Sequence, residues 1–258
     1  MHDVEGPSYE VAPDKLFLTA EWRYLAMLNY EVDDRLLLPF VPAGTELDRW
    51  NGEVFVSLVG FRFLKTRVLR CAIPFHTNFD EVNLRFYVRR RQGDEVRRGV
   101  VFVKEIVPRR AIAWVARTIY NENYVALPMA HEIRAVGESG LAVVYRWGTA
   151  SGWNAIRLEA QGKAELANEG SEEQFITEHY WGYAAQPDGG CVEYRVTHPA
   201  WKVWSARSAD FEGDVEALYG KGFAAVLSGQ PSSAFLAEGS AVSVMRGRRL
   251  SVPRTVSP

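Results

Sequence analysis

An unbroken alternation of apolar and polar residues runs from Glu81 to Arg89 within the segment FDEVNLRFYVRRR at 79–91. One parity holds Val82, Leu84, Phe86 and Val88, and the other holds Glu81, Asn83, Arg85, Tyr87 and Arg89. Because successive side chains of a strand point to opposite faces, this segment is predicted to be a β-strand with one apolar and one hydrogen-bonding face. The polar face is either solvent-exposed surface or the wall of a polar pocket, and the alternation favours neither.

The length and composition of the chain indicate one globular domain. Hydrophobic residues make up 47% of the 258 residues and charged residues 24%, which is enough apolar material for a sizeable core. We find no internal repeat and no long linker rich in Pro, Gly or Ser. We expect a flexible arm at 1–15, a single domain at 16–245 and a flexible tail at 246–258.

Charge and motif content exclude several function classes. The chain has 30 basic and 32 acidic residues, so no basic field would hold a nucleic acid. The acidic N-terminus has no apolar core, and no apolar run approaches the roughly 20 residues of a membrane span. We therefore expect a cytoplasmic protein without a membrane partner.

Neither a cofactor nor a metal is expected. Cys71 and Cys191 form no CxxC pair, and the five histidines show no HxH or HExxH spacing. The chain also lacks GxGxxG and GxxxxGK loops. His179 and His198 are interpreted as hydrogen-bonded structural groups.

Most of the chain is predicted to be strand. Besides 79–91, the strands are expected at 22–30, 53–63, 99–106, 132–136, 141–147, 153–161, 190–198, 223–227 and 241–245. Gly93-Asp94 is predicted to join the strand at 79–91 to that at 99–106 in a hairpin.

Helices are expected at three places. Leu36, Leu37 and Leu38 precede Pro39 and form a short turn. Apolar residues recur at helical spacing over 109–124. Ser171 is a good N-cap for a helix that runs to about residue 180.

Two strands carry candidate chemistry. Glu81 and Arg85 are about 13 Å apart along a strand, so each must meet a group on a neighbour. In a cavity, Arg85 would bind a carboxylate and Glu81 would act as an acid or base. The alternative is that this face is surface or forms structural ion pairs. Lys104 is a lone cation in VVFVKEIV. It would either form a Schiff base with a carbonyl substrate or cover apolar surface with its stem.

Four segments resemble the YqjF-like family of uncharacterised bacterial proteins, also called DUF2071. They are FDEVNLRFYV at 79–88, GVVFVKEIVPR at 99–109, EHYWGY at 178–183 and EYRVTHPAW at 193–201. The resemblance spans roughly residues 16–205. It implies membership of the acetoacetate decarboxylase-like superfamily. The implied fold is mainly β (α+β), a closed antiparallel β-barrel or cone around a small-molecule cavity with two or three short peripheral helices.

The same resemblance implies positions for site residues. Acetoacetate decarboxylases carry a Gly-Arg-Glu segment, to which Ala116-Arg117-Thr118 is similar, and a Schiff-base lysine shortly after it. Counting onward from Arg117 reaches Asn123-Tyr124, so that lysine is absent here. Glu81 resembles the cavity glutamate of the family, and Tyr124 would stand near the position of the nucleophile.

Three functional hypotheses follow. In the first, a cavity binds a small carboxylated or carbonyl-bearing molecule, with Arg85 or Arg117 holding the anion. Glu81, Asn83, Tyr124 and His76 would supply its other polar groups. In the second, the protein is a decarboxylase or related lyase that uses Lys104, or Glu81 with Tyr124. In the third, side chains fill the cavity and the protein acts through its surface as a homodimer.

Overall fold

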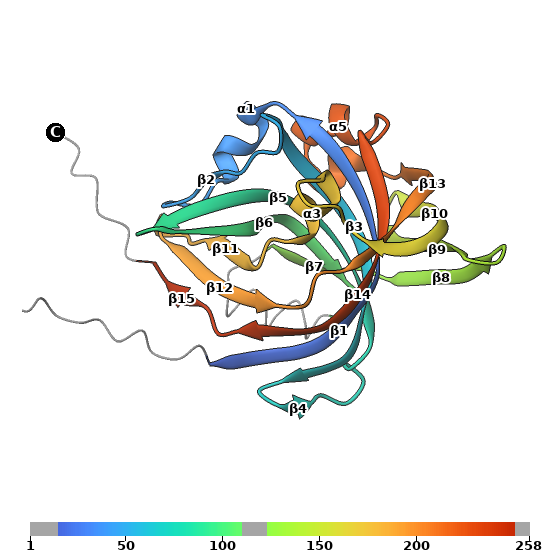
Figure 1. Ribbon diagram of the computed structural model, residues 1–258, viewed down its shortest axis with the longest axis horizontal. Helices are drawn as coiled ribbons and strands as arrows, with labels where there is room; N and C mark the ends of the chain where they lie inside the picture. Colours follow the sequence, from blue (N-terminus) through green and yellow to red (C-terminus); the bar gives the residue numbers. More distant parts are fainter. Residues whose placement is uncertain (1–14, 110–122, 251–258) are drawn as a thin grey trace, which may run out of the picture.

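The computed structural model describes residues 15–109 and 123–250, and it is mainly β with a few short helices (Figure 1). The first eight strands are β1 (Leu16–Val32), β2 (Glu46–Leu47), β3 (Val54–Val68), β4 (Cys71–Ala72), β5 (Phe79–Gln92), β6 (Glu95–Val107), β7 (Tyr124–Ala126) and β8 (Met129–Val136). The others are β9 (Gly140–Thr149), β10 (Gly152–Leu166), β11 (Trp181–Ala185), β12 (Cys191–Thr197), β13 (Lys202–Glu212), β14 (Ser233–Met245) and β15 (Arg248–Arg249).

The helices are short (Figure 1). They are α1 (Asp34–Leu37), the 3-10 helix η1 (Leu38–Phe40), α3 (Glu172–Thr177), α4 (Val215–Tyr219) and α5 (Lys221–Leu227). No helix in the described ranges is long and apolar enough to cross a membrane.

The strands form one sheet that curves around an interior. Its order is β15-β12-β11-β6-β5-β3-β1-β14-β13-β10-β9-β8, and an additional β12–β14 pairing connects the sheet back to itself. Two of the junctions are short, since β11 meets β6 over two register pairs and β12 meets β14 over two. The mainly β expectation is confirmed, whereas a closed barrel or cone remains a prediction.

The strand predicted from the alternation is β5. It pairs antiparallel with β6 across the turn at Gly93, as expected for a hairpin. Its apolar parity, represented by Val82 and Leu84, enters one hydrophobic core, while Phe79 and Tyr87 enter a second core on the other face. The polar parity is therefore buried as well, and solvent-exposed surface is excluded for its central residues.

The prediction of a strand at 223–227 is wrong. The residues form α5, in which Phe223 and Leu227 are buried and Ala225 between them is exposed. Side chains four apart share one face of a helix, whereas a strand would place all three on the same face. The predicted helix at 109–124 lies mostly outside the described residues. Strands β11 and β13 were not predicted.

The short helix at 172–177 confirms the prediction from Ser171. Its side chain accepts a hydrogen bond from the backbone N–H of Gln174 at 3.2 Å, which satisfies one free donor of the first turn. Phe175 and Ile176 of this helix are buried against the interior of the curved sheet. The helix thus packs inside the curve of the sheet (Figure 1).

Candidate functional site

A pocket of about 190 Å³ lies inside the curve of the sheet. Its wall comes from β1, β3, β5, β6, β11, β12 and β14. The loop between β4 and β5, β7, the end of α3 and the segments before β11 and β13 complete it. Ten of the lining residues are aromatic: Phe17, Trp22, Phe61, Phe63, Phe79, Phe102, Tyr124, Trp181, Tyr194 and Trp201. The volume is small beside the roughly 300–1,000 Å³ of sites for drug-sized ligands, so it suits a compact molecule.

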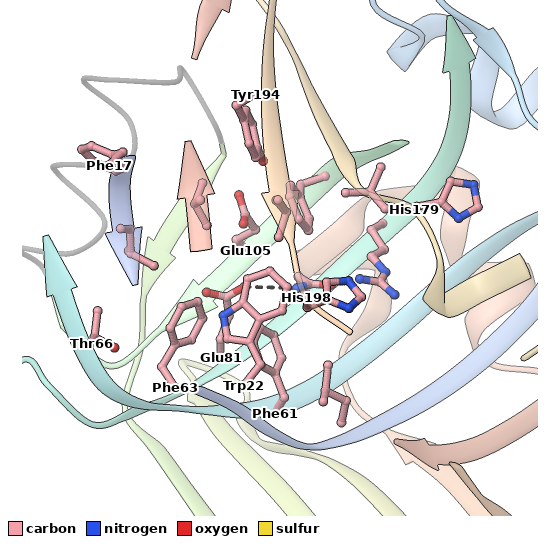
Figure 2. Close-up of a pocket in the computed structure, with 18 of the residues that line it drawn as sticks. Phe17, Trp22, Phe61, Phe63, Thr66, Glu81, Glu105, His179, Tyr194 and His198 are labelled. Atoms are coloured by element: carbon pink, nitrogen blue, oxygen red, sulfur yellow. Dashed lines mark hydrogen bonds between the residues drawn. The ribbon is translucent and has the colours of Figure 1, made fainter. Parts of the chain in front are cut away.

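One side of the pocket is an aromatic cluster from β1, β3 and β5. The ring of Phe63 stacks on that of Phe79 with centroids 4.6 Å apart, and Trp22 meets Phe63 edge to face at 5.7 Å. In Figure 2, Trp22, Phe61 and Phe63 lie together beside Glu81. These rings give the pocket an apolar wall, so polar contacts inside it act at a lower effective dielectric than in water.

The polar face of β5 lines the pocket. Glu81, Asn83 and Arg85 all contribute, and the amide of Asn83 donates to Glu81 Oε1 at 3.1 Å. Neighbouring members are about 7 Å apart along the strand. A ligand that lies along β5 therefore meets a carboxylate, an amide and a guanidinium in turn.

Tyr124 approaches Glu81 from β7. Its hydroxyl donates to Glu81 Oε2 at 3.5 Å, and β7 runs parallel to β6 with Tyr124 opposite Glu105. Glu105 also lines the pocket and is buried. The predicted pair of Glu81 and Tyr124 thus lies together. Glu105 is a pocket residue that the sequence analysis does not predict, because Lys104 is the candidate group in that strand.

Arg85 is a buried cation in a largely apolar environment. Its side chain donates to the carbonyl of Ile176 at 3.4 Å, and its guanidinium carbon lies 5.7 Å from the centre of the Tyr87 ring. Arg85 is 8% exposed, and no described carboxylate forms an ion pair with it. Its Nε also has no hydrogen-bond partner among the described residues.

His179 supports the wall next to Arg85. Its Nε2 lies 3.1 Å from Asp48 Oδ2, and Arg98 donates to the same oxygen at 2.6 Å. Burial lowers the pKa of His179 to about 4, against the opposing effect of the Asp48 hydrogen bond. His179 is therefore neutral near pH 7. Its ring points away from the other labelled side chains (Figure 2).

His198 lies at the edge of the pocket. Its Nδ1 is 2.9 Å from the carbonyl oxygen of Pro199, and its ring stacks on Trp201 with centroids 4.2 Å apart. Burial lowers its pKa, and the charge of Arg85 adds to this effect. The sequence-based interpretation of both histidines as hydrogen-bonded groups agrees with these contacts but missed that both line the pocket.

Lys104 does not face the pocket, which corrects the hypothesis that it shares a cavity with Glu81. Lys104 pairs with Leu84, whose side chain enters the first core, and its amine donates to the carbonyl of Leu218. Strand alternation accounts for this, because Glu105 takes the pocket face and its neighbour must take the other. Burial lowers the pKa of Lys104.

No lysine lines the pocket. All six lysines of the sequence lie in the described ranges, at positions 15, 65, 104, 163, 202 and 221, and none is among the lining residues. The lysine predicted to be missing is thus not replaced by one from another element.

Two predicted site residues remain, His76 and Arg117. His76 lines the pocket and its Nδ1 lies 2.8 Å from the carbonyl oxygen of Pro74. Arg117 lies outside the described residues. Over 15–109 and 123–250 there is no group of three or more His, Cys, Asp or Glu side chains placed to hold a metal ion.

Several polar atoms of the pocket wall lack a partner. Among the described residues, buried nitrogen or oxygen atoms without a hydrogen bond occur in Trp22, Thr66, Asn83 and Arg85. Buried polar groups are nearly always hydrogen-bonded, and an unpaired one costs roughly 1–3 kcal/mol. Their concentration around one space is typical of a binding site.

Comparisons with known proteins agree with the fold. Residues 19–241 match DUF2071, a family described as an uncharacterized conserved protein. A relative, the uncharacterized protein YqjF of Bacillus subtilis (strain 168), is 29% identical over 123 residues, which are 46% of this chain. The match spans 49% of the length of that relative, or about half.

Solved structures extend the likeness over nearly the whole chain. Acetoacetate decarboxylase from Legionella pneumophila matches with a TM-score of 0.62 and 13% identity, covering 97% of this chain and 98% of that one. The enduracididine biosynthesis enzyme MppR with HEPES buffer bound matches with a TM-score of 0.66 and 14% identity, covering 98% and 100%. MppR complexed with pyruvate matches with a TM-score of 0.62 and 13% identity, covering 94% of each. Identities this low concern the fold alone.

Proposed function

This chain belongs to the DUF2071 family, and from that premise we propose that its pocket binds a small organic molecule that carries a carboxylate or a carbonyl group. Arg85 would bind the carboxylate. Asn83, Glu81 and Tyr124 would contact the rest of the molecule, and His76 would contact it near the edge.

The observation that carries this proposal is the buried charge of Arg85, which forms no ion pair with a carboxylate of the described residues. A buried cation without a counter-ion costs several kcal/mol, and an anionic ligand removes that cost. A guanidinium also matches a carboxylate with two parallel hydrogen bonds. The neutral state of His179 leaves Arg85 as the charged group at that end of the pocket wall.

The fold neighbours support the chemical class. One of them is a structure of MppR complexed with pyruvate, a small carboxylate that also carries a carbonyl. The open volume of about 190 Å³ speaks against the alternative in which side chains fill the cavity. A pyruvate-sized molecule is compatible with that volume.

A thermal-shift titration tests the proposal. We expect pyruvate, acetoacetate or a related acid to raise the melting temperature, since a ligand at 100 times its Kd stabilises a protein by about 2.7 kcal/mol. The variant Arg85→Gln should lose most of this shift, whereas Arg89→Gln should keep it, because Arg89 pairs with Glu46 at the surface. An equal shift in both variants would reject Arg85 as the anion site.

A second candidate function is acid–base catalysis by Glu81 and Tyr124. The observation in its favour is the contact of 3.5 Å between the Tyr124 hydroxyl and Glu81 Oε2 inside the pocket. An assay of acetoacetate decarboxylation, in which the release of carbon dioxide is measured, tests it. Activity that Tyr124→Phe abolishes would support it, and no release by the unaltered protein would reject it for this substrate.

The imine route through Lys104 has no support from the geometry. Its amine hydrogen-bonds to the carbonyl of Leu218, away from the pocket. Borohydride reduction with pyruvate or acetoacetate, followed by intact-mass measurement, is expected to trap no adduct. A trapped adduct that Lys104→Met removes would restore this route.

A further inference from the structure

An open groove of about 570 Å³ adjoins the pocket on its β11–β12 side. Its lining includes Arg97 from β6, Arg195 from β12 and Arg248 from β15, with Glu95 as the acidic member. These strands lie next to one another at one end of the sheet (Figure 1). Three residues from separate parts of the chain thus bring guanidinium groups to one surface hollow.

A buried carboxylate below the groove fixes two of these arginines. Glu193 is 0% exposed, and its Oε2 accepts from Arg97 Nη1 at 2.8 Å and from Arg248 Nη2 at 2.7 Å. Arg90 and the Tyr183 hydroxyl donate to its other oxygen. Arg97 is held further because its guanidinium stacks over Trp181 at 4.3 Å. Arg97 and Arg248 are therefore held in place before any ligand binds.

The cluster keeps a surplus of positive charge. Four arginines, Arg90, Arg97, Arg195 and Arg248, stand against two glutamates, Glu95 and Glu193, which leaves a net charge of +2. Arg195 is exposed and forms no ion pair with any residue that the structure describes. Each guanidinium has five N–H donors, so donors remain for a further acceptor.

The groove and the pocket share part of their walls. Trp181, Val196 and His198 line both spaces. His198 is also close enough to Arg85 for its charge to lower the histidine's pKa. Cationic groups therefore stand in both adjoining spaces, Arg85 in the pocket and the groove arginines outside it.

We propose that this groove is a second anion subsite, and that the ligand of the protein is a dianion with one carboxylate at Arg85 and a second carboxylate or phosphate at Arg97, Arg195 and Arg248. This rests on the proposed function for the end at Arg85. The assignment of the second anionic group to the groove rests on the guanidinium cluster and on the wall that the groove shares with the pocket.

The test compares dicarboxylates with monocarboxylates of the same chain length. Calorimetric titration of the full chain with the unbranched series from malonate to adipate, and with the matching acids from acetate to hexanoate, gives the affinities. We expect one length to bind at least tenfold more tightly as the dicarboxylate. Arg195→Gln should weaken that dicarboxylate by about fivefold, since a charge-assisted hydrogen bond is lost, and leave its monocarboxylate partner unchanged.

Two further variants make the outcomes distinguishable. Arg207→Gln, an exposed arginine on β13 outside both spaces, should change neither affinity. Arg85→Gln should weaken both ligand types. If Arg195→Gln leaves every dicarboxylate unchanged, the outer subsite is overturned while the role of Arg85 stands. If Arg195→Gln weakens dicarboxylate binding but Arg85→Gln changes no affinity, the proposed function fails and the groove remains an anion site.

A phosphate arm separates the two anion types. A phosphorylated acid such as 3-phosphoglycerate is titrated under the same conditions. If the groove is adapted to phosphate, this acid should bind more tightly than the best dicarboxylate. Inorganic phosphate alone should compete with the outer group of either ligand and not with a monocarboxylate. Competition with the monocarboxylate would place the phosphate at Arg85 and overturn the outer subsite.

Discussion

Gly182 lies directly opposite Tyr194 across the β11–β12 pair, and the Tyr194 ring occupies the space that a Cβ on residue 182 would need. Tyr194 lines the pocket, so the absence of a side chain at Gly182 positions one wall of the site. The glycine is required here by close approach and not by its backbone angles, since its φ is not positive.

The variant Gly182→Ala is therefore expected to displace Tyr194 and to destabilise the protein by about 1–3 kcal/mol, as overpacking does in well-packed interiors. Ligand-induced thermal shifts should shrink as well. Gly148→Ala is the matched control, because its Cβ would meet the Trp153 ring at an ordinary 3.7 Å. Equal urea midpoints for the two variants would contradict the prediction.

Removal of the Arg85 charge is expected to raise the stability of the ligand-free protein. Arg85→Met keeps the length of the side chain and removes the desolvation cost, so the free energy of unfolding should increase by about 1–3 kcal/mol. Arg89→Met, on the same strand and exposed, should change it by under about 1 kcal/mol. Urea unfolding measures both. A destabilised Arg85→Met variant would mean that Arg85 has a stabilising partner.

Acid is expected to destabilise the protein through His179. Burial holds the pKa of His179 at about 4 in the folded state, below its ordinary value of 6.5. Between these values the unfolded state binds more protons, so stability is present at neutral pH and falls as the pH falls from 6.5 to 4. The loss is on the order of 3 kcal/mol, and the lowered pKa of His198 acts in the same direction.

The variant His179→Gln tests this pH dependence. The glutamine amide can donate to Asp48 without titrating, so the fall in stability between pH 6.5 and 4 should be shallower than in the unaltered protein. Because hydrogen bonds from His179 and Arg98 outweigh the effect of burial, the pKa of Asp48 is lowered, and its contribution is lost only at still lower pH. Parallel pH profiles for the two proteins would exclude His179 as the source.

Glu193 is expected to be the most sensitive charged residue of the sheet. Glu193→Gln leaves Arg90, Arg97 and Arg248 without their shared buried carboxylate, which should cost about 3–5 kcal/mol. The exposed Glu95, which also pairs with Arg97, gives the control, because Glu95→Gln should cost under about 1 kcal/mol. Similar unfolding midpoints for both variants would show that burial does not control the strength of this cluster.

Local patterns predicted much of the secondary structure. The alternation at 79–91 and the turn at Gly93 predicted β5 and its hairpin with β6, and Ser171 predicted the start of α3. The segment 223–227 was mistaken for a strand because a short apolar run has no clear period, and burial of Phe223 and Leu227 alone reveals the helical face.

The site was predictable only in part. Glu81, Asn83 and Arg85 share a face because the pleat of one strand places them there, and this follows from sequence. Glu105, His179, His198 and Trp22 reach the same pocket from other elements. Aromatic richness was the only sequence signal for such a wall, and it did not identify individual residues.

The amino-acid order by itself determined which side chains of β5 point the same way, because that alternation is set within one strand. It did not determine which face would enclose a pocket. Only the tertiary structure decided this, since the curved sheet brings β11 and β12, about a hundred residues later in the chain, over the polar face of β5. The same packing turned Lys104 toward Leu218 and left Arg85 as the buried cation of the pocket.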